Sequence, residues 1–246
     1  MKKIGMIGGL AWPSTIEYYK MICTKVSDFH QKRGDTPPYA VPEMVIESAN
    51  IAETRALRGK TSDETSWAKF DEKFRSTLLK LKAAGADFGF IASNTPHMRI
   101  QSITKDLDFK VISILDAMAQ TARNEQAQKV LVLGTAVTMR APVYQKILNQ
   151  FHIETVPQLP SEIIDEIQHL IDTDFYTGNP IDARARLLAI CHEYAEKETT
   201  AISLARTELP LAFPDQAESE TFEFDGFQFI NTTVAHVNAV VEEVLG

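Results

Sequence analysis

Cysteine is scarce in this chain of 246 residues, which has only Cys23 and Cys191. Two widely separated thiols have neither the spacing of a metal site nor the number that a disulfide framework needs. Free cysteine usually packs as a small hydrophobic residue. We therefore expect both thiols to be buried or without a functional role, which fits the reducing cytoplasm.

Long apolar runs are also missing from the sequence. The apolar start is broken at Gly8, Gly9 and Pro13, whereas a signal peptide needs a longer uninterrupted stretch. No window approaches the 18 or more apolar residues that a membrane-spanning helix requires. The sequence thus predicts a cytoplasmic protein with no membrane partner.

There is no excess of basic residues. Lysine and arginine number 25 against 33 acidic residues, which gives a formal charge of −8. Proteins that coat nucleic acids usually carry a basic surface, so no nucleic-acid partner is expected. A hydrophobic content of 44% is ordinary for a globular protein with a packed core.

Several common motifs are absent as well. The Gly8-Gly9 turn lacks both the G-x-G-x-x-G and the Walker spacing, and no H-E-x-x-H or clustered Cys/His set exists. A G-x-S-x-G elbow is also missing. Nucleotide cofactors, metal sites and serine-hydrolase chemistry are therefore poorly supported, and we expect no cofactor.

The residues that are present alternate between short apolar runs and helical patterns. Gly85 suits the C-terminal cap of the amphipathic helix before it. Such alternation predicts an α/β fold with a parallel sheet covered by helices on both faces. The expected strands are residues 3–7, 44–47, 88–92 and 111–115, and the expected helices begin near residue 14 and span 67–82.

The pattern then restarts near the middle of the chain. Residues 129–148 resemble residues 3–22 in having a basic residue, an apolar strand, a glycine turn, a proline and a tyrosine-bearing helix. This similarity predicts two similar doubly wound lobes, although unrelated units of this type also look alike. The expected first lobe is residues 1–116 plus 226–246, and the second is 117–225. The acidic run 218–225 is interpreted as a surface segment that crosses between the lobes.

Small polar residues follow four of the expected strands. Ligands of open parallel sheets bind beyond the carboxyl ends of the strands. Two facing lobes would therefore bring these residues to one active site in the interlobe cleft. The four sets are Gly8-Gly9, Ser93-Asn94-Thr95, Gly134-Thr135 and Arg206-Thr207-Glu208.

Each set has an ordinary structural explanation beside the functional one. Ser93, Asn94 and Thr95 suit an anion such as a carboxylate, but the same residue types are preferred helix caps. His97 either faces the same ligand or is structural. Arg206 follows a buried strand, so either Glu208 neutralises its charge or it faces an anionic ligand.

Together these motifs resemble the aspartate/glutamate racemase family over nearly the whole chain. The matching stretches are IGMIGGLAWPSTIEYY, IASNTPH, LVLGTAVTM and SLARTELPL. The opening stretch resembles the amino-acid racemase subgroup. The resemblance implies an isomerase with two similar lobes, an active site between them, no cofactor and assembly as a homodimer.

The resemblance also reveals a departure at the catalytic positions. Family chemistry uses two cysteines, in the motifs C-N-T-x-H and G-C-T-E, on opposite sides of the substrate α-carbon. Here the motifs read S-N-T-P-H and A-R-T-E, so Ser93 and Arg206 stand at the acid/base positions. A serine needs a base, for which His97 is the candidate, and an arginine stays protonated. We therefore predict that racemisation of aspartate or glutamate is weak or absent.

Two other functions remain open. One is one-sided carbanion or lyase-type chemistry by Ser93 and His97, with Arg206 stabilising the charge. The other is a non-catalytic relic that binds a small carboxylate. The helix that begins near Pro160 lacks the lysine with which many relatives bind a carboxylate, and Arg206 is a candidate to replace it. The expected binding residues are Asn94, Thr95, Thr135, Thr207, Glu208 and His236, the less secure Asn231, and the backbone of Leu10, Ala11 and Trp12.

Overall fold

The computed structural model describes residues 1–60, 63–175 and 179–246, which form two compact units. Unit 1 comprises residues 1–113 and 237–246, and unit 2 comprises residues 114–236. Each unit has its own sheet and its own core.

Unit 1 is built from alternating strands and helices, as its apolar pattern predicts. Helix α3 ends where Gly85 adopts φ +88°, with backbone hydrogen bonds that close its last turn, so the predicted cap is confirmed. The elements are β1 (Ile4–Gly8), α1 (Trp12–Arg33), β2 (Met44–Ser48), α2 (Ile51–Ala56), the 3₁₀ helix η1 (Glu64–Trp67), α3 (Ala68–Ala83), β3 (Phe88–Ile91), the 3₁₀ helix η2 (Thr95–Arg99), α4 (Ile100–Thr104) and β4 (Val111–Ile112).

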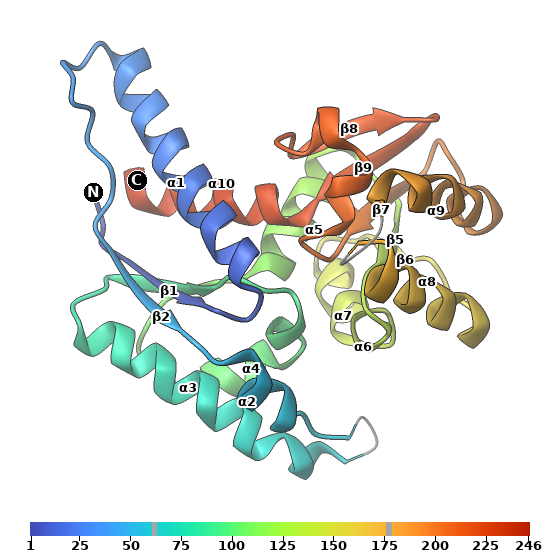
Figure 1. The fold of residues 1–246 in the computed structure, drawn as a ribbon, viewed down its shortest axis with the longest axis horizontal. Helices are drawn as coiled ribbons and strands as arrows, with labels where there is room; N and C mark the ends of the chain where they lie inside the picture. Colours follow the sequence, from blue (N-terminus) through green and yellow to red (C-terminus); the bar gives the residue numbers. More distant parts are fainter. Residues whose placement is uncertain (61–62, 176–178) are drawn as a thin grey trace. The chain divides into compact units, whose positions relative to one another are not determined.

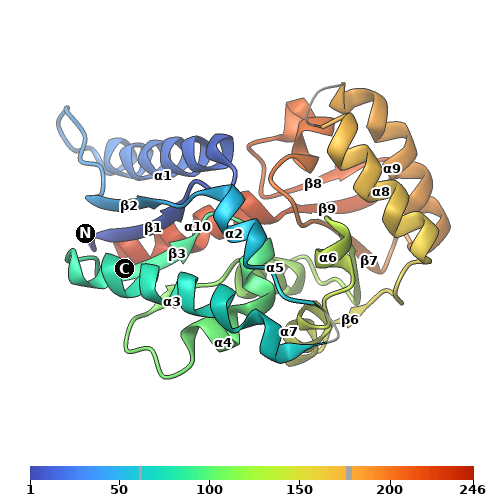
Figure 2. The ribbon, with the colours of Figure 1, turned by 60° about the horizontal axis from the view of Figure 1, so that its bottom comes forward.

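The four strands of unit 1 form a parallel sheet in the order β2-β1-β3-β4. Helices α1 and α3 lie on opposite sides of this sheet (Figures 1 and 2). Ile4 and Met6 pack against α1 and the last part of α10, whereas Gly5 brings its strand close to Leu81 of α3. Burial on both faces explains why the central strands β1 and β3 are continuously apolar, whereas the edge strand β2 is partly exposed.

Unit 2 has the same alternation, followed by a hairpin. Its elements are α5 (Ile114–Asn124), β5 (Lys129–Leu133), α6 (Ala136–Met139), α7 (Val143–Gln150), β6 (Glu154–Thr155), α8 (Ser161–Thr173), α9 (Pro180–Tyr194), β7 (Thr200–Leu204), the 3₁₀ helices η3 (Leu209–Ala212) and η4 (Pro214–Gln216), β8 (Thr221–Phe224), β9 (Phe227–Asn231) and α10 (Thr232–Leu245). The residues of α10 up to His236 belong to unit 2 and the rest to unit 1.

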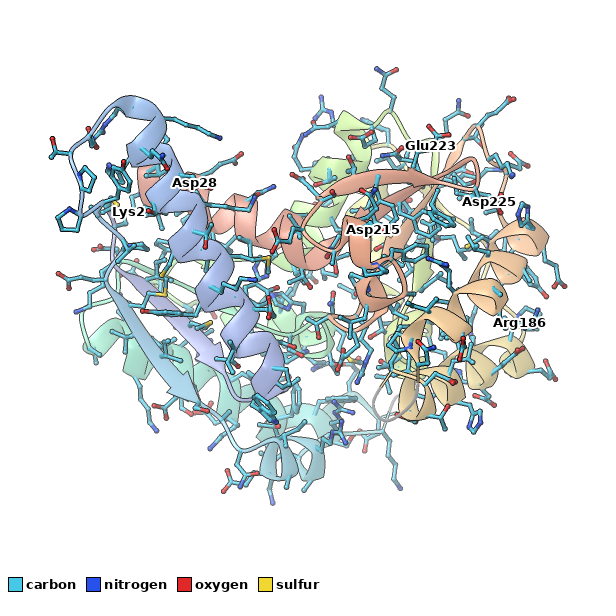
Figure 3. All side chains as sticks on the ribbon, turned by 45° about the horizontal axis from the view of Figure 1, so that its top comes forward. Lys2, Asp28, Arg186, Asp215, Glu223 and Asp225 are labelled. Carbon is cyan, nitrogen blue, oxygen red and sulfur yellow. The ribbon has the colours of Figure 1, made fainter. Side chains whose placement is uncertain are left out.

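The sheet of unit 2 has the order β6-β5-β7-β9-β8, with β8 antiparallel and the other strands parallel. A hydrophobic core packs α8 and α9 on one face of this sheet, and α5 and α7 lie on the other (Figure 2). Glu223 and Asp225 lie on the β8–β9 hairpin at the edge of the sheet (Figure 3).

The predicted similarity of the two lobes appears in their topology. Strand β1 lies between β2 and β3, and β5 lies between β6 and β7. Strands β3 and β7 occupy matching places beside the first strand of each sheet. The α/β class with two parallel-dominated sheets is therefore confirmed.

Three details of the prediction need correction. Strand β9 pairs with β7, so residues 227–231 belong to the second sheet, and only residues 237–246 join unit 1. The acidic run 218–225 contains the edge strand β8, because Phe222 packs inward and is only 6% exposed. The strand expected at 111–115 ends at Ile112, and α5 begins at Ile114.

Within the described part of the chain, no helix combines the length and apolar character needed to cross a bilayer.

Candidate functional site

The turn after β1 is held tightly against the chain that follows β2. Gly9 has φ +77°, and a Cβ atom there would lie 2.2 Å from the Ala49 carbonyl oxygen. Its N–H donates to the Thr15 hydroxyl at 2.8 Å, and the Ala49 N–H donates to the Gly8 oxygen at 2.9 Å. Only glycine fits this combination of positive φ and close contact.

The three residues after this turn differ in position. Leu10 is buried at 9% exposure, and Ala11 is the half-buried N-cap of α1. The Trp12 side chain is 71% exposed. A role for the backbone of this stretch in binding stays a prediction.

The segment after β3 folds into a tight turn and the 3₁₀ helix η2. The Ser93 N–H donates to the Ile91 oxygen at 2.8 Å, and the His97 N–H donates to the Asn94 oxygen at 3.0 Å. Ser93 and Thr95 are half-buried, and Asn94 is 7% exposed. The predicted hydroxyls therefore do lie at the carboxyl end of β3.

His97 is fully buried beneath this turn. Its Nδ1 atom lies 2.7 Å from the Ser93 carbonyl oxygen. Burial lowers the pKa of His97 to about 4, and hydrogen bonds with the backbone of Ser93 and Ile112 oppose this only in part. The imidazole is thus neutral at pH 7 and holds the turn from inside. Of the two alternatives for His97, this geometry fits the structural one.

A small cavity of about 20 Å³ joins the strand ends of unit 1. Its walls include three predicted residues, Leu10, Ser93 and Thr95. They also include Thr54 and Arg58, which sequence reasoning missed. Arg58 lies just beyond α2. The sequence could have indicated it only as a positively charged residue that follows soon after the end of a strand.

In unit 2, the end of β7 carries an ion pair. The Arg206 Nη2 atom donates to Glu208 Oε1 at 3.1 Å, and Nε lies 3.0 Å from Oε2. The Thr207 hydroxyl donates to the same carboxylate at 2.8 Å. The sequence left two alternatives for Arg206, and this geometry fits the one in which Glu208 neutralises its charge.

The end of β5 is also occupied by groups of the chain itself. The Thr135 hydroxyl caps the short helix α6 and lies 2.9 Å from the Thr138 hydroxyl. The Ala136 N–H donates to the amide oxygen of Gln168, which α8 contributes, at 2.8 Å. The helix start after Thr135 therefore already has a hydrogen-bond partner inside unit 2.

The junction of β9 and α10 is buried and tightly bonded. Asn231 donates to the Ala217 oxygen at 2.9 Å, and its Oδ1 atom accepts from Thr233 and Val234 at 3.2 and 3.3 Å. Asn231 is thus a helix cap that also holds a loop. His236 is fully buried in α10.

The two cysteines lie on helices, away from the strand ends. Cys23 is half-buried on α1 and Cys191 is buried on α9. Burial raises the pKa of both thiols, that of Cys191 to about 12. Neither forms a disulfide. The expected burial is confirmed for Cys191, and the lack of a functional role of both thiols stays a prediction.

A larger cavity of about 350 Å³ lies in unit 2 along the outer edge of β5. The segment after β6 and the link between α6 and α7 form its other walls. Tyr144 lines it, but the hydroxyl of this residue is buried and has no partner among the described residues. Across residues 1–60, 63–175 and 179–246, no group of three or more potential metal ligands exists.

Comparisons with known proteins converge on one family. The family model for Asp/Glu/hydantoin racemases matches residues 7–240. The broad specificity amino-acid racemase RacX of Bacillus subtilis (strain 168) is 30% identical over 146 residues, which are 59% of this chain and 60% of RacX. The chain therefore matches somewhat less than two thirds of that relative.

Solved structures show the same similarity over the full length. An aspartate racemase homologue from Pyrococcus horikoshii OT3 is 27% identical, with a TM-score of 0.76 over 100% of both chains. A putative Asp/Glu racemase from Yersinia pestis has a TM-score of 0.78 at 24% identity, also over 100% of both chains. The latter supports the fold alone.

Proposed function

This chain belongs to the Asp/Glu/hydantoin racemase family, and we propose on that basis that it binds a small amino acid or dicarboxylate. We further propose that it racemises aspartate or glutamate weakly or not at all. The similarity to a protein named as a broad specificity amino-acid racemase supports the ligand class.

One observation carries the second part of the proposal: the ion pair of Arg206 and Glu208 at the end of β7. By resemblance, Arg206 stands where relatives have a catalytic cysteine. An arginine keeps its proton at any physiological pH, and this guanidinium is ion-paired with the carboxylate of Glu208. This position therefore cannot remove an α-proton.

The other acid/base position, Ser93, also lacks activation. Its hydroxyl has no hydrogen-bond partner among the described residues, and the Nδ1 atom of His97 is directed at the backbone oxygen of Ser93. A serine hydroxyl is a weak base without a neighbour that accepts its proton. Cys23 and Cys191 cannot substitute, because they lie on α1 and α9.

Proton exchange in D₂O tests this proposal. The protein is incubated with each enantiomer of aspartate, glutamate and alanine, and α-deuterium is measured by NMR while chiral chromatography follows inversion. We expect binding by calorimetry with exchange and inversion at or near the uncatalysed rate. Inversion at a rate typical of enzymes, above about 1 s⁻¹, would show that a racemase remains. Deuterium incorporation without inversion would indicate one-sided proton transfer instead.

Independence from a cofactor, location in the cytoplasm and assembly as a homodimer stay predictions. They rest on the composition and on the family resemblance.

A further inference from the structure

We propose that the cavity along the outer edge of β5 is a second ligand site, contained in unit 2, and that its ligand is a small uncharged cyclic amide with an apolar body. This inference goes beyond the proposed function, because none of the residues expected to bind an amino acid lines this cavity. It depends on Tyr144 and on the edge of β5 at Val132, which no motif identified.

The first step is the course of the two strands beside the cavity. Strands β5 and β6 pair through only two residues of each strand. The ladder ends where the Val156 N–H donates to the Val130 oxygen at 2.9 Å. Beyond this bond, residues 131–132 of β5 and residues 157–159 line the cavity of about 350 Å³ instead of pairing with each other.

The second step is the open edge of β5 at Val132. The backbone groups of a strand point alternately to its two neighbours, so those of Val132 face the same side as those of Val130. The ladder with β6 does not reach Val132, and its N–H and C=O have no other partner on this side among the described residues. An unpaired strand edge binds an amide through main-chain hydrogen bonds. A cyclic amide suits this edge best, because its ring holds the N–H and the C=O on one side.

The third step is the hydroxyl of Tyr144, a residue of α7 that lines the same cavity. Tyr144 is 4% exposed, and its hydroxyl is buried without a partner among the described residues. Buried polar groups in proteins nearly always have a hydrogen-bond partner. Burial raises the pKa of Tyr144, so the hydroxyl keeps its proton and can donate. An acceptor on a ligand in the cavity would supply the missing partner.

The fourth step is the charge of the cavity wall. Arg140 is the only charged side chain among the described residues that line it. This arginine already has a partner, since its Nη2 atom lies 2.8 Å from Asp165 Oδ1. A charged ligand would lose its hydration here without gaining an ion partner of its own. The wall therefore favours an uncharged ligand over a carboxylate or an amine.

The remaining wall is largely apolar and sets the body of the ligand. It includes Met139, Pro142, Val156 and Leu159. Ligand sites combine apolar walls with a few polar groups and begin at about 300 Å³, so the cavity is large enough for a fused ring. A pure hydrocarbon would leave the hydroxyl of Tyr144 unpaired, whereas an amide on an apolar ring satisfies both parts of the wall.

Titration of the full chain with quinolin-2(1H)-one tests the proposal, because this probe carries a cyclic amide on a fused ring. Ligand-detected NMR should give a dissociation constant below about 1 mM, an ordinary value for a ligand of this size. N-methylquinolin-2-one lacks the amide N–H, and quinoline-2-carboxylate carries a charge. Both should bind at least about tenfold more weakly than the probe.

Tyr144→Phe is the matching substitution in the protein, because it removes the hydroxyl alone. It should weaken binding of the probe about fivefold, which is the effect of one hydrogen bond between neutral groups. The melting temperature of the free protein should stay the same or rise, since the hydroxyl has no partner there. Tyr194→Phe on α9 is the control, because Tyr194 does not line the cavity. It should change the affinity by less than about twofold.

The outcomes decide on each part of the inference. Equal affinity of wild type and Tyr144→Phe for the probe would overturn the site. Equally tight binding of the N-methyl compound would overturn the pairing with the edge of β5, and tighter binding of the carboxylate would overturn the uncharged ligand class.

Competition with L-aspartate separates this inference from the proposed function. Saturating aspartate should leave the affinity for the probe unchanged, because the two ligands occupy different sites. Displacement of the probe by aspartate would overturn a second site while supporting the binding of an amino acid. Wild-type protein that binds aspartate but not the probe would overturn this inference alone, and binding of the probe without aspartate would contradict only the proposed function.

Discussion

At the scale of single residues, the ion pair of Arg206 and Glu208 at the end of β7 contributes to the free energy of unfolding. The two side chains are 14% and 18% exposed, so each charge depends on the other more than a surface pair would. We expect Glu208→Gln to lower the free energy of unfolding by about 2 kcal/mol, because Arg206 then keeps a poorly solvated charge. Urea denaturation measures this loss.

A double substitution provides the control for this prediction. Arg206→Met with Glu208→Met removes both charges and should stay within about 1 kcal/mol of wild type, since buried pairs are often replaceable by apolar side chains. A single Glu208→Gln variant as stable as wild type would contradict the coupling.

The second prediction at this scale concerns His97 and pH. Burial lowers the pKa of His97 in the folded state to about 4 from an ordinary value of 6.5. The unfolded chain therefore binds a proton first as the pH falls, so this contribution to stability is complete above pH 6.5 and is lost towards pH 4. Each pKa unit corresponds to about 1.4 kcal/mol, which gives a loss of about 3 kcal/mol.

Unfolding in urea at pH 7, 6, 5 and 4 measures this loss. His97→Asn should flatten the profile between pH 6.5 and 4, because the titrating group is gone. His192→Gln, a substitution at a surface residue that pairs with Asp225, should leave most of the profile intact. The same slope in wild type and His97→Asn would show that other groups carry the pH dependence.

The position of a single residue was predictable from the sequence only where it directly followed an expected strand. The strand-end positions of Ser93, Thr95 and Arg206 followed from the strand pattern, because polar residues directly after an apolar run lie at a sheet edge. Arg58 was not predictable, since its place beside Ser93 depends on how α2 packs after β2. The burial of His97 was equally hidden, because a polar residue four positions after Ser93 fits either face of the turn.

At the scale of elements, the turns after β1 and β2 are in close contact at Gly9. Substitution of Gly9 can be compared with substitution of Gly34, which lies at the end of α1 and outside this contact. Gly9 and Gly34 have similar positive φ values, +77° and +88°. A Cβ atom at Gly9 would clash with the backbone of Ala49, whereas one at Gly34 would meet nothing within 4 Å. Gly34→Ala should therefore cost only the left-handed strain, about 1–2 kcal/mol.

Gly9→Ala should cost at least about 2 kcal/mol more than Gly34→Ala, because overpacking adds to the same strain. Thermal unfolding of the two variants gives the comparison. Equal losses of stability in the two variants would show that the turns after β1 and β2 can move apart to accommodate the added methyl group.

A cluster of aromatic rings connects the loop after Arg206 to the β8–β9 hairpin. Phe213 lies in the loop after Arg206, and its ring centroid is 4.9 Å from that of Phe229 and 5.2 Å from that of Phe222. Phe213→Ala should lower stability by about 3–5 kcal/mol. Leu211→Ala, at a side chain that is 48% exposed, should change it by no more than about 0.5 kcal/mol.

Urea denaturation of both variants checks this difference. A loss of less than about 1 kcal/mol for Phe213→Ala would mean that the loop is held by its backbone alone.

Most elements were predictable because helix and strand periodicities are local. The β8–β9 hairpin was missed although its signals are present: Thr221–Phe224 alternates in side-chain character, and Asp225-Gly226 is a favoured hairpin turn. Acidic residues are more typical of a surface segment than of a strand that is paired in a sheet. The pairing of β9 with β7 was not predictable, since it depends on contacts between distant segments.

At the scale of the whole molecule, the two units differ in how the chain builds them. Unit 2 is one continuous segment, residues 114–236, whereas unit 1 needs both ends of the chain. Val237, Val240 and Val244 belong to the core of unit 1. Residues 114–236 expressed alone should thus unfold cooperatively in urea, whereas residues 1–113 alone should not.

Circular dichroism and fluorescence follow both fragments. A synthetic peptide of residues 232–246, added to residues 1–113, should restore structure, because it supplies the missing valines. Cooperative unfolding of residues 1–113 without the peptide would contradict this division of the core.

The placement of Cys23 and Cys191 on helices has a consequence for the environment that the protein tolerates. An enzyme whose chemistry depends on two accessible thiolates loses activity when peroxide or an alkylating agent modifies them. Here the strand ends carry a hydroxyl, a guanidinium and a carboxylate, which such reagents do not attack under mild conditions. The ligand binding proposed for this chain should therefore persist under peroxide or alkylating treatment that inactivates an enzyme with two catalytic thiolates.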